Sequence, residues 1–361
     1  MVSYTRPIKY IKNNFVKIID LRSDTVTQPT PGMMEAMMQA RVGDDVFMED
    51  PDTYELEEMA ADMFDKEAAL FCPSGTMTNQ IAIKLHTRPG DEVICDRLSH
   101  VYNFEGGGIG FHSGSSIRTL TGDRGRFTAA DVEDNINDRE DVHKPWSSLV
   151  VVENTSNKGG GALWDWQELE KIRTVCDANE LKLHIDGARL FNAIVGQQQD
   201  PKEYGRLFDT LSVCLSKGLG APVGSLLLGS KADIKKARRL RKVMGGGMRQ
   251  SGYLAAAAKY ALHHHVDRMH DDHLRARQLG EALENLEMVE NVLPVESNIV
   301  IFHLKEGLEE GEILNELQDS GIKAVPFGPG TIRMVTHLQI DDEMIQTTIQ
   351  VLGEVNASHQ Q

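Results

Sequence analysis

Six short apolar runs recur from about residue 68 onward, and helix-like stretches lie between several of them. The runs are EAALFC, DEVICD, SSLVVVEN, LKLHID, TLSVCL and GSLLLG. Runs of this length are typical of strands, and their alternation with stretches such as WQELEKIRTVCDAN predicts a mostly parallel sheet with helices on both faces. The expected fold class is therefore α/β.

The pattern changes after RQSGYLAAAAKYALHHH. A long polar helix is predicted at about residues 266–287, followed by the strand-like runs SNIVIFHL, GIKAVPF and TIRMVTH and a helix near EGEILNELQDS. A chain of 361 residues is long enough for a large domain and a smaller one. We expect an N-terminal extension over 1–17, a large domain over 18–265 and a small α+β domain over 266–361, joined by the long helix.

Two helices are predicted near the N-terminus. Thr30 before Pro31 is a favourable helix start, and PDTYELEEMAADMF predicts a second helix with Asp52 as its cap. The first helix carries four methionines at helical spacing, which we expect to pack in the core. They are Met33, Met34, Met37 and Met38.

Composition excludes several classes of partner. With 54 acidic and 38 basic residues the formal net charge is −16, which opposes binding to nucleic acid or to an anionic membrane surface, although a few placed cations can still bind a small anion. No apolar run is long enough to span a membrane, and the N-terminus lacks the apolar stretch of a secretory signal. The four cysteines form no CxxC pair and are expected to be reduced and mostly buried. We expect a soluble cytoplasmic protein that acts on a small molecule.

A lysine and an aspartate each follow a strand-like run. Lys217 lies in LSKGLGAPVGS, and the glycines around it allow a bulky group to approach the backbone. Asp186 ends the run LKLHID, where a buried carboxylate is costly without a cation. A protonated pyridine nitrogen would be such a cation, and the acid would keep the ring electron-withdrawing. The alternative role for Asp186 is a helix cap.

Two further strings suit a ligand that carries such a ring and a phosphate. In FCPSGTMTNQ, the residues Ser74, Gly75 and Thr76 open a helix, and hydroxyls with free N–H groups at such a position bind phosphate, although a plain capping turn looks similar. His100 in DRLSHVYNF has an imidazole that could stack on a flat ring; a structural histidine is the alternative. The HHH run at 263–265 predicts no metal site, because adjacent helical residues point in different directions.

The order of phosphate loop, stacking ring, strand-end acid and lysine resembles the fold-type I enzymes that use pyridoxal phosphate (PLP). The strings DLRSDTVTQPT, FCPSGTMTNQ, HIDGARLFNA, LSKGLGAPVGS, GGGMRQ and IRMVTH resemble the threonine aldolases over roughly residues 18–350. The resemblance implies a carbon–carbon lyase that cleaves threonine or allo-threonine to glycine and an aldehyde. β-Elimination, racemisation or transamination on the same frame stay open. A non-catalytic scaffold is a further alternative, against which Lys217 and Asp186 argue.

The resemblance also implies a role for each matched residue on the cofactor. Lys217 would carry PLP, Asp186 would face its pyridine nitrogen, and His100 would stack on its ring. The residues implied for the phosphate are Ser74, Gly75 and Thr76.

Substrate and subunit contacts are implied in the same way. Ser23, Arg189 and Arg333 would hold the substrate carboxylate, Arg189 also lying near the cofactor ring. Arginine suits this task because its planar fork gives paired, charged hydrogen bonds, whereas a surface ion pair is the alternative for each. Lys242 and Arg249, around GGGMRQ, would reach the site of a neighbouring subunit in a homotetramer built from tight dimers.

One position departs from the family pattern. The string ENTSNKGGG has Ser156 where the family places a histidine that faces the substrate's β-hydroxyl. Serine is a poor base near neutral pH unless another group activates it. We expect Ser156 to line the substrate site and to affect the preference for β-configuration and aldehyde. The base is then His100, an ordered water or a phosphate-bound water.

Overall fold

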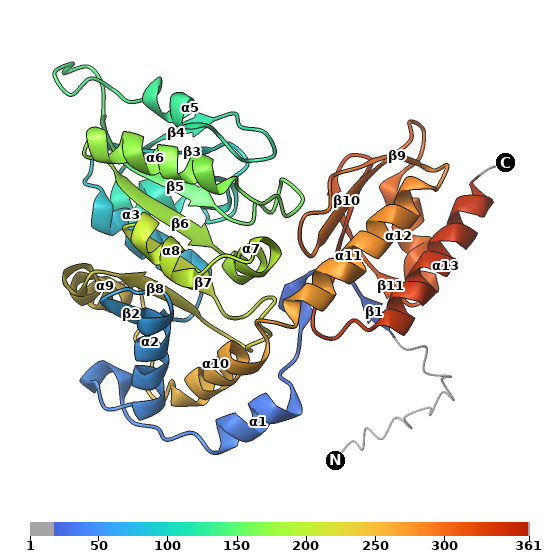
Figure 1. The fold of residues 1–361 in the computed structure, drawn as a ribbon, viewed down its shortest axis with the longest axis horizontal. Helices are drawn as coiled ribbons and strands as arrows, with labels where there is room; N and C mark the ends of the chain where they lie inside the picture. The colour runs from blue at the N-terminus through green and yellow to red at the C-terminus, as the bar shows by residue number, and fades with distance from the viewer. Residues whose placement is uncertain (1–17, 360–361) are drawn as a thin grey trace, which may run out of the picture.

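The computed structural model describes residues 18–359 and forms two lobes (Figure 1). The larger lobe is built on a seven-stranded sheet in which β3 to β7 are parallel and β8 is antiparallel to both of its neighbours. In spatial order the strands are β2 (Ala68–Cys72), β8 (Ser225–Gly229), β7 (Thr210–Cys214), β6 (Lys182–Gly187), β5 (Trp146–Glu153), β3 (Asp91–Asp96) and β4 (Ser116–Leu120). The predicted α/β class with a mostly parallel sheet is confirmed.

Helices cover both faces of this sheet because successive strand residues point to opposite sides. Leu149 and Val151 of β5 pack on the face covered by α3, whereas Val150 and Val152 pack on the face covered by α6. The helices of the larger lobe that follow β2 are α3 (Gly75–His86), α4 (His100–Asn103), α5 (Ala129–Glu133), α6 (Trp166–Ala178), α7 (Leu190–Gln197), α8 (Pro201–Leu207), α9 (Lys231–Val243) and α10 (Gly252–His264). Short helical turns are η1 (Asp24–Val26), η2 (Asp45–Phe47) and η3 (Ile109–Ser113).

The two N-terminal helices correct part of the prediction. α1 (Pro31–Met38) starts as expected, with the Thr30 hydroxyl accepting a hydrogen bond from the Met33 N–H. α2 (Pro51–Met63) is capped by Asp50 and not by Asp52, because Pro51 occupies the first helical position. Of the four methionines only Met33 is fully buried. Met34 and Met38 are 48% and 81% exposed, so the core assignment was wrong for them.

The smaller lobe contains an antiparallel sheet of order β12-β13-β10-β9, packed against helices around a second apolar core. Its elements are α11 (Met269–Glu284), β9 (Val289–Val292), β10 (Ile299–Leu304), α12 (Glu310–Asp319), β11 (Ile322–Lys323), β12 (Val325–Gly328), β13 (Thr331–Val335) and α13 (Asp342–Ser358). The short N-terminal strand β1 (Ile19–Asp20) pairs in parallel with β11, a pairing that the sequence did not predict. The predicted domain boundaries stay predictions, and residues 1–17 lie outside the described part of the chain.

No helix between residues 18 and 359 combines the length and apolar character that crossing a membrane requires.

Candidate active site

The candidate residues of the larger lobe gather at one edge of its sheet. Asp186 lies near the end of β6, Lys217 follows β7, Ser74 follows β2 and His100 follows β3. The carboxyl ends of parallel strands meet at this edge, which is where α/β folds bind ligands. The topology therefore brings together residues that lie far apart in the sequence.

Asp186 is a buried acid with one unsatisfied oxygen. Asp186 is only 2% exposed. Its Oδ1 accepts a hydrogen bond from the Ala188 N–H at 3.1 Å, and its Oδ2 has no hydrogen-bond partner among residues 18–359. A buried carboxylate oxygen without a partner is costly, and a ligand cation such as a pyridinium would satisfy it. Asp186 is not a helix cap, since α7 begins at Leu190 after Arg189.

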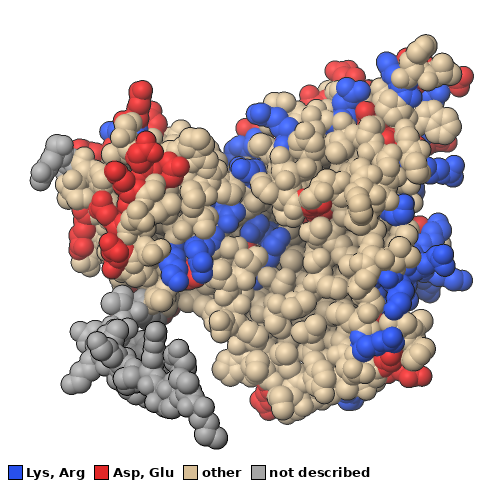
Figure 2. All heavy atoms as spheres, turned by 180° about the vertical axis from the view of Figure 1, so that it is seen from behind, with Lys and Arg blue, Asp and Glu red and all other residues tan. Residues whose placement is uncertain are grey.

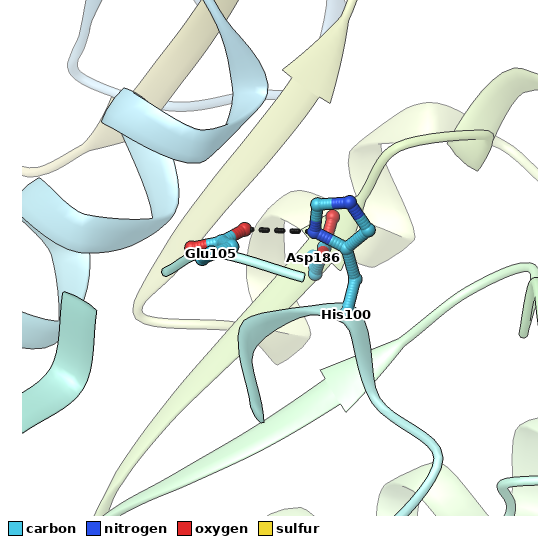
Figure 3. A group of neighbouring side chains, drawn as sticks. All are labelled: His100, Glu105 and Asp186. Atoms are coloured by element: carbon cyan, nitrogen blue, oxygen red, sulfur yellow. Dashed lines mark hydrogen bonds and ion pairs between the residues drawn. The ribbon is translucent and has the colours of Figure 1, made fainter. Parts of the chain in front are cut away.

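His100 and Glu105 lie beside Asp186, and the three side chains point toward one another (Figure 3). His100 Nδ1 lies 3.0 Å from Glu105 Oε1, and buried Glu105 also accepts hydrogen bonds from the side-chain amides of Asn79 and Gln80. Burial lowers the pKa of His100, but the Glu105 hydrogen bond and the neighbouring carboxylates outweigh it, so the pKa is raised. The ligand atoms of the three side chains lie within 4.8 Å of one another, a spacing that a metal could bridge. The helix N-terminus at Ser74 and the lysine at 217, described next, suit PLP instead.

The N-terminus of α3, at Ser74, Gly75 and Thr76, is open to solvent, and these three residues are called the phosphate cup below. Ser74 caps the helix, its Oγ accepting from the Met77 N–H at 3.2 Å, and Ser74 and Thr76 are exposed. A Cβ added to Gly75 would lie 3.5 Å from the Ser225 hydroxyl, which is buried and has no partner in the described structure. Free N–H groups and hydroxyls at a helix start suit a phosphate. Sequence reasoning missed Ser225, which only the β2–β8 pairing brings here.

Lys217 lies in a tight turn after β7. Its carbonyl accepts a hydrogen bond from the Gly220 N–H at 2.8 Å, and Gly220 has a φ of +76°, a conformation that glycine adopts without strain. Its side-chain nitrogen makes no hydrogen bond or ion pair with any residue that the structure describes, although its charge contributes to the lowered pKa of Asp24. Asp186, the phosphate cup and this free amine together match the three ends of PLP, so the residues present fit the cofactor.

Arg189 is fully engaged by an acid that the sequence did not single out. Asp24 accepts two hydrogen bonds from it, Nε to Oδ2 at 2.8 Å and Nη2 to Oδ1 at 2.7 Å, and both side chains are buried. Burial raises the pKa of Asp24, but the Arg189 charge and hydrogen bonds outweigh it and lower the pKa to about 2. Ser23 lies next to this pair, with its hydroxyl accepting from the Thr25 N–H at 3.2 Å. The charge of Arg189 is thus balanced by Asp24 and does not require a substrate carboxylate.

Arg333 of β13 has no such acid. Its Nη1 donates to Asn157 Oδ1 at 3.0 Å, its Nη2 donates to the Arg22 carbonyl at 3.1 Å, and its Nε is buried without a partner within residues 18–359. Burial, followed by the charge of Arg189, lowers the pKa of Arg333 to about 10. Asn157 also accepts from Arg189 Nη1 at 3.4 Å. Arg333 is therefore the guanidinium suited to a substrate carboxylate. Asn157, like Ser225 and Asp24, is a residue that the sequence did not reveal.

Ser156 lies in the same loop, directly before Asn157. It is buried, its Oγ accepts from the Gly159 N–H at 3.3 Å, and a Cβ added to Gly125 would come within 2.3 Å of that oxygen. The hydroxyl is therefore held within its own loop, and its contact with the substrate's β-hydroxyl stays a prediction. The following residue, Asn157, reaches the arginines in its place.

Lys242 and Arg249 lie apart from these groups. Lys242 is in the last turn of α9, and Arg249 pairs with Asp44 at 2.7 Å, its guanidinium 6.0 Å from the Phe47 ring centre. Their predicted role needs a second subunit and stays a prediction.

Basic side chains gather in the hollow between the two lobes, whereas acidic side chains cover the outer face of the smaller lobe (Figure 2). This distribution favours an anionic ligand in the hollow despite the net charge of −16.

Comparisons with known proteins agree with this site. The family model described as beta-eliminating lyase matches residues 20–306. A probable low-specificity L-threonine aldolase of Arabidopsis thaliana is 41% identical over 346 residues, covering 94% of this chain and 98% of its own. The low specificity L-threonine aldolase of Escherichia coli K12 is 38% identical over 328 residues, covering 91% and 96%. The solved threonine aldolase of Leishmania major has a TM-score of 0.81 at 24% identity, covering 94% and 99%. The fold is thus the fold-type I architecture predicted from the sequence, and the chain belongs to the beta-eliminating lyase family and, within it, to the threonine aldolases.

Proposed function

We propose that this protein cleaves threonine or allo-threonine to glycine and an aldehyde. It is a PLP-dependent carbon–carbon lyase by family. The observation that carries the proposal is a pair of buried atoms, Asp186 Oδ2 and Arg333 Nε, that have no hydrogen-bond partner within residues 18–359. An amino acid joined to a pyridinium-bearing cofactor supplies both partners.

PLP, when bound, supplies an electron-withdrawing ring that takes up the electrons released as the Cα–Cβ bond breaks. Asp186 keeps the ring nitrogen protonated, because an opposed carboxylate favours the charged form. Lys217 would hold the cofactor through its amine, and His100 would contact its ring. Ser74, Gly75 and Thr76 at the start of α3 would hold the phosphate.

Arg333 binds the substrate carboxylate, with Ser23 beside it. Arg189 is held by Asp24 and acts mainly through its position near the cofactor ring. A carboxylate fixed by a planar guanidinium would hold the substrate in one orientation, which cleavage of its Cα–Cβ bond needs.

We assign the proton of the β-hydroxyl to His100. Glu105 binds the Nδ1 side of the imidazole, which leaves Nε2 as the atom that exchanges a proton. Burial lowers the pKa of His100, but the Glu105 hydrogen bond and the neighbouring carboxylates raise it overall, which makes its neutral imidazole a stronger base. Ser156, whose hydroxyl is held within its own loop, is not assigned this task.

We further propose a homotetramer of dimers, with Lys242 and Arg249 reaching a neighbouring site. Exposed apolar side chains near Arg249 support an interface there, including Phe47 and Met48.

We also propose a cytoplasmic location, supported by four cysteines that are all free and buried. The domain division at residue 265 is proposed as predicted.

Product analysis tests the activity. The purified, PLP-loaded protein is offered threonine, allo-threonine and β-phenylserine, and glycine and aldehyde are measured in equal amounts. Release of ammonia with a keto acid would replace the proposal with β-elimination, and a keto acid without ammonia would replace it with transamination. Loss of optical purity without glycine would replace it with racemisation. Borohydride followed by mass spectrometry should place PLP on Lys217, and Lys217→Ala should carry no adduct.

A further inference from the structure

Glu153 is a buried acid that neither the motifs nor the proposed chemistry has used. It is the last residue of β5 and lies in register beside Asp186 of β6. Its residue is 5% exposed, and its own carbonyl accepts a hydrogen bond from the Trp164 indole at 2.9 Å. A second carboxylate therefore stands directly next to the one assigned to the cofactor.

Both oxygens of Glu153 accept backbone N–H groups from functional segments. Oε2 accepts from the His100 N–H at 2.6 Å, at the start of α4. Oε1 accepts from the Asn157 N–H at 2.8 Å, in the loop that reaches the arginines. One carboxylate thus fixes the residue against the cofactor ring and the residue that contacts Arg333.

This arrangement is costly, which argues against mere space-filling. Two buried carboxylates on adjacent strands repel each other, and burial together with the Asp186 charge raises the pKa of Glu153 to about 7. The other charged or titratable groups that act on it are His100 of α4, Arg189 before α7 and Cys95 of β3. A residue with no task at the site would avoid such surroundings.

We propose that Glu153 is a positioning residue that sets the spacing between His100, against the cofactor ring, and Arg333, at the substrate carboxylate, through the N–H groups of His100 and Asn157. The part of the proposal that concerns Arg333 rests on the proposed function, because that function supplies the substrate carboxylate. The part that concerns His100, called the cofactor half below, requires only that the protein binds PLP.

Glu153→Gln tests the role. A glutamine has one acceptor oxygen, so one of the two N–H groups must face the amide NH₂, and one segment shifts. We expect the KM for threonine to rise about tenfold with a smaller fall in kcat, and the Kd for PLP, titrated by its visible absorption, to rise several-fold.

Glu57→Gln is the matched control. Glu57 is also 5% exposed and accepts a backbone N–H, that of Phe71 at 2.8 Å, but it pairs with Arg238 and does not contact the site. Its variant should lose comparable stability and keep the parent KM and PLP affinity. Equal kinetic losses in the two variants would reduce Glu153 to a structural acid and overturn the proposal.

Asn157→Ala keeps the test decisive if Glu153→Gln does not fold. It frees Arg333 while leaving the Glu153 carboxylate intact, so KM should rise and PLP affinity should stay at the parent value. In the double variant the KM increase should be smaller than the product of the single increases, because both changes break one route. An unchanged KM in Asn157→Ala would overturn the route to Arg333. Failure of the wild type to release glycine would refute the proposed function, and the PLP titration would still decide the cofactor half.

Discussion

The cofactor side of the site (Ser74, His100, Asp186 and Lys217) and its carboxylate side (Ser23, Asp24, Arg189 and Arg333) each contain a buried aspartate. Within residues 18–359, Asp186 Oδ2 has no hydrogen-bond partner, whereas both oxygens of Asp24 accept hydrogen bonds from Arg189. On the carboxylate side, the atom without a hydrogen-bond partner in the described structure is instead Arg333 Nε. An unsatisfied acceptor at one end of the site and an unsatisfied donor at the other are complementary to a ligand with a pyridinium and a carboxylate. The two acids therefore have different tasks although their burial is the same.

Asp24→Asn should show the largest effect and should act on stability. The change leaves the Arg189 guanidinium buried without its counter-charge, so the free energy of unfolding should fall by about 3–5 kcal/mol. Asp20→Asn is the control, since the Asp20–Arg22 pair is partly exposed and should contribute less than about 1 kcal/mol. Urea unfolding measures both. Similar small losses in the two variants would mean that Asp24 is not the counter-charge of Arg189.

Asp186→Asn should act on rate instead. The amide fills the same space and PLP still binds, but the ring nitrogen is no longer held protonated, so kcat should fall on the order of a hundredfold or more. Stability should change little or rise, because an unpaired buried charge is removed. Steady-state cleavage of threonine with saturating PLP measures the effect. A variant that turns over at nearly the parent rate would make Asp186 a structural acid.

The two sides should also respond to pH with opposite signs in the PLP-free protein. The pKa of Asp24 is lowered to about 2, so its stabilisation is present above 3.8 and is lost as pH falls toward 2. The pKa of Glu153 is raised to about 7, so its contribution is greatest below 4.5 and is lost as pH rises through 7. Over its pH range, each group should change the free energy of unfolding by something on the order of 2 kcal/mol.

Urea unfolding of PLP-free protein from about pH 2 to about pH 8 measures both changes in stability. Asp24→Asn should remove the loss of stability at acidic pH, and Glu153→Gln should remove the loss of stability that occurs as pH rises toward 7. A stability that rises from pH 5 to 7 and does so equally in Glu153→Gln would contradict the assignment.

Arg333→Lys should have a smaller, kinetic effect. Lysine keeps the charge but loses the planar fork that orients the carboxylate, so KM should rise about tenfold and kcat should fall less. Arg139→Lys is the control, because Arg139 forms an exposed pair with Glu180 far from the site. Kinetics with threonine and β-phenylserine compare the two. Parent values for both substrates in Arg333→Lys would remove Arg333 from the carboxylate site.

The contrast also explains what the sequence could predict. Each residue of the cofactor side lies within three residues of the end of a strand or the start of a helix, and such boundaries are visible as local patterns. The carboxylate side depends on contacts that no local pattern contains. Asp24 pairs with Arg189 from 165 positions away, and Asn157 contacts Arg333 from 176 positions away. The sequence indicated the arginines but not which of them already had a counter-charge.

The fold shows the same limit. All six apolar runs became strands of the large sheet, but β4 was missed because Ser116–Leu120 is a mostly exposed or half-buried edge strand with little apolar character. Helical spacing placed the methionines of α1 on one face, yet spacing does not reveal what covers a face, and Met38 is exposed. Pairing of β1 with β11 depends on the chain returning after some 300 residues, which periodicity does not encode.

Ser156 should show the smallest effect, and it tests where the carboxylate side ends. Its hydroxyl is bound to the Gly159 N–H and packed against Gly125, so Ser156→Ala should change the ratio of kcat/KM for threonine and allo-threonine by less than about twofold, roughly 0.4 kcal/mol. Ser156→His is the informative partner. An imidazole has no room beside Gly125 and Gly159, so the ring must turn out of this space toward the site, and the ratio should then shift well beyond twofold. A large shift in Ser156→Ala would show that the serine itself contacts the β-carbon substituents, and it would restore the role expected from the family pattern.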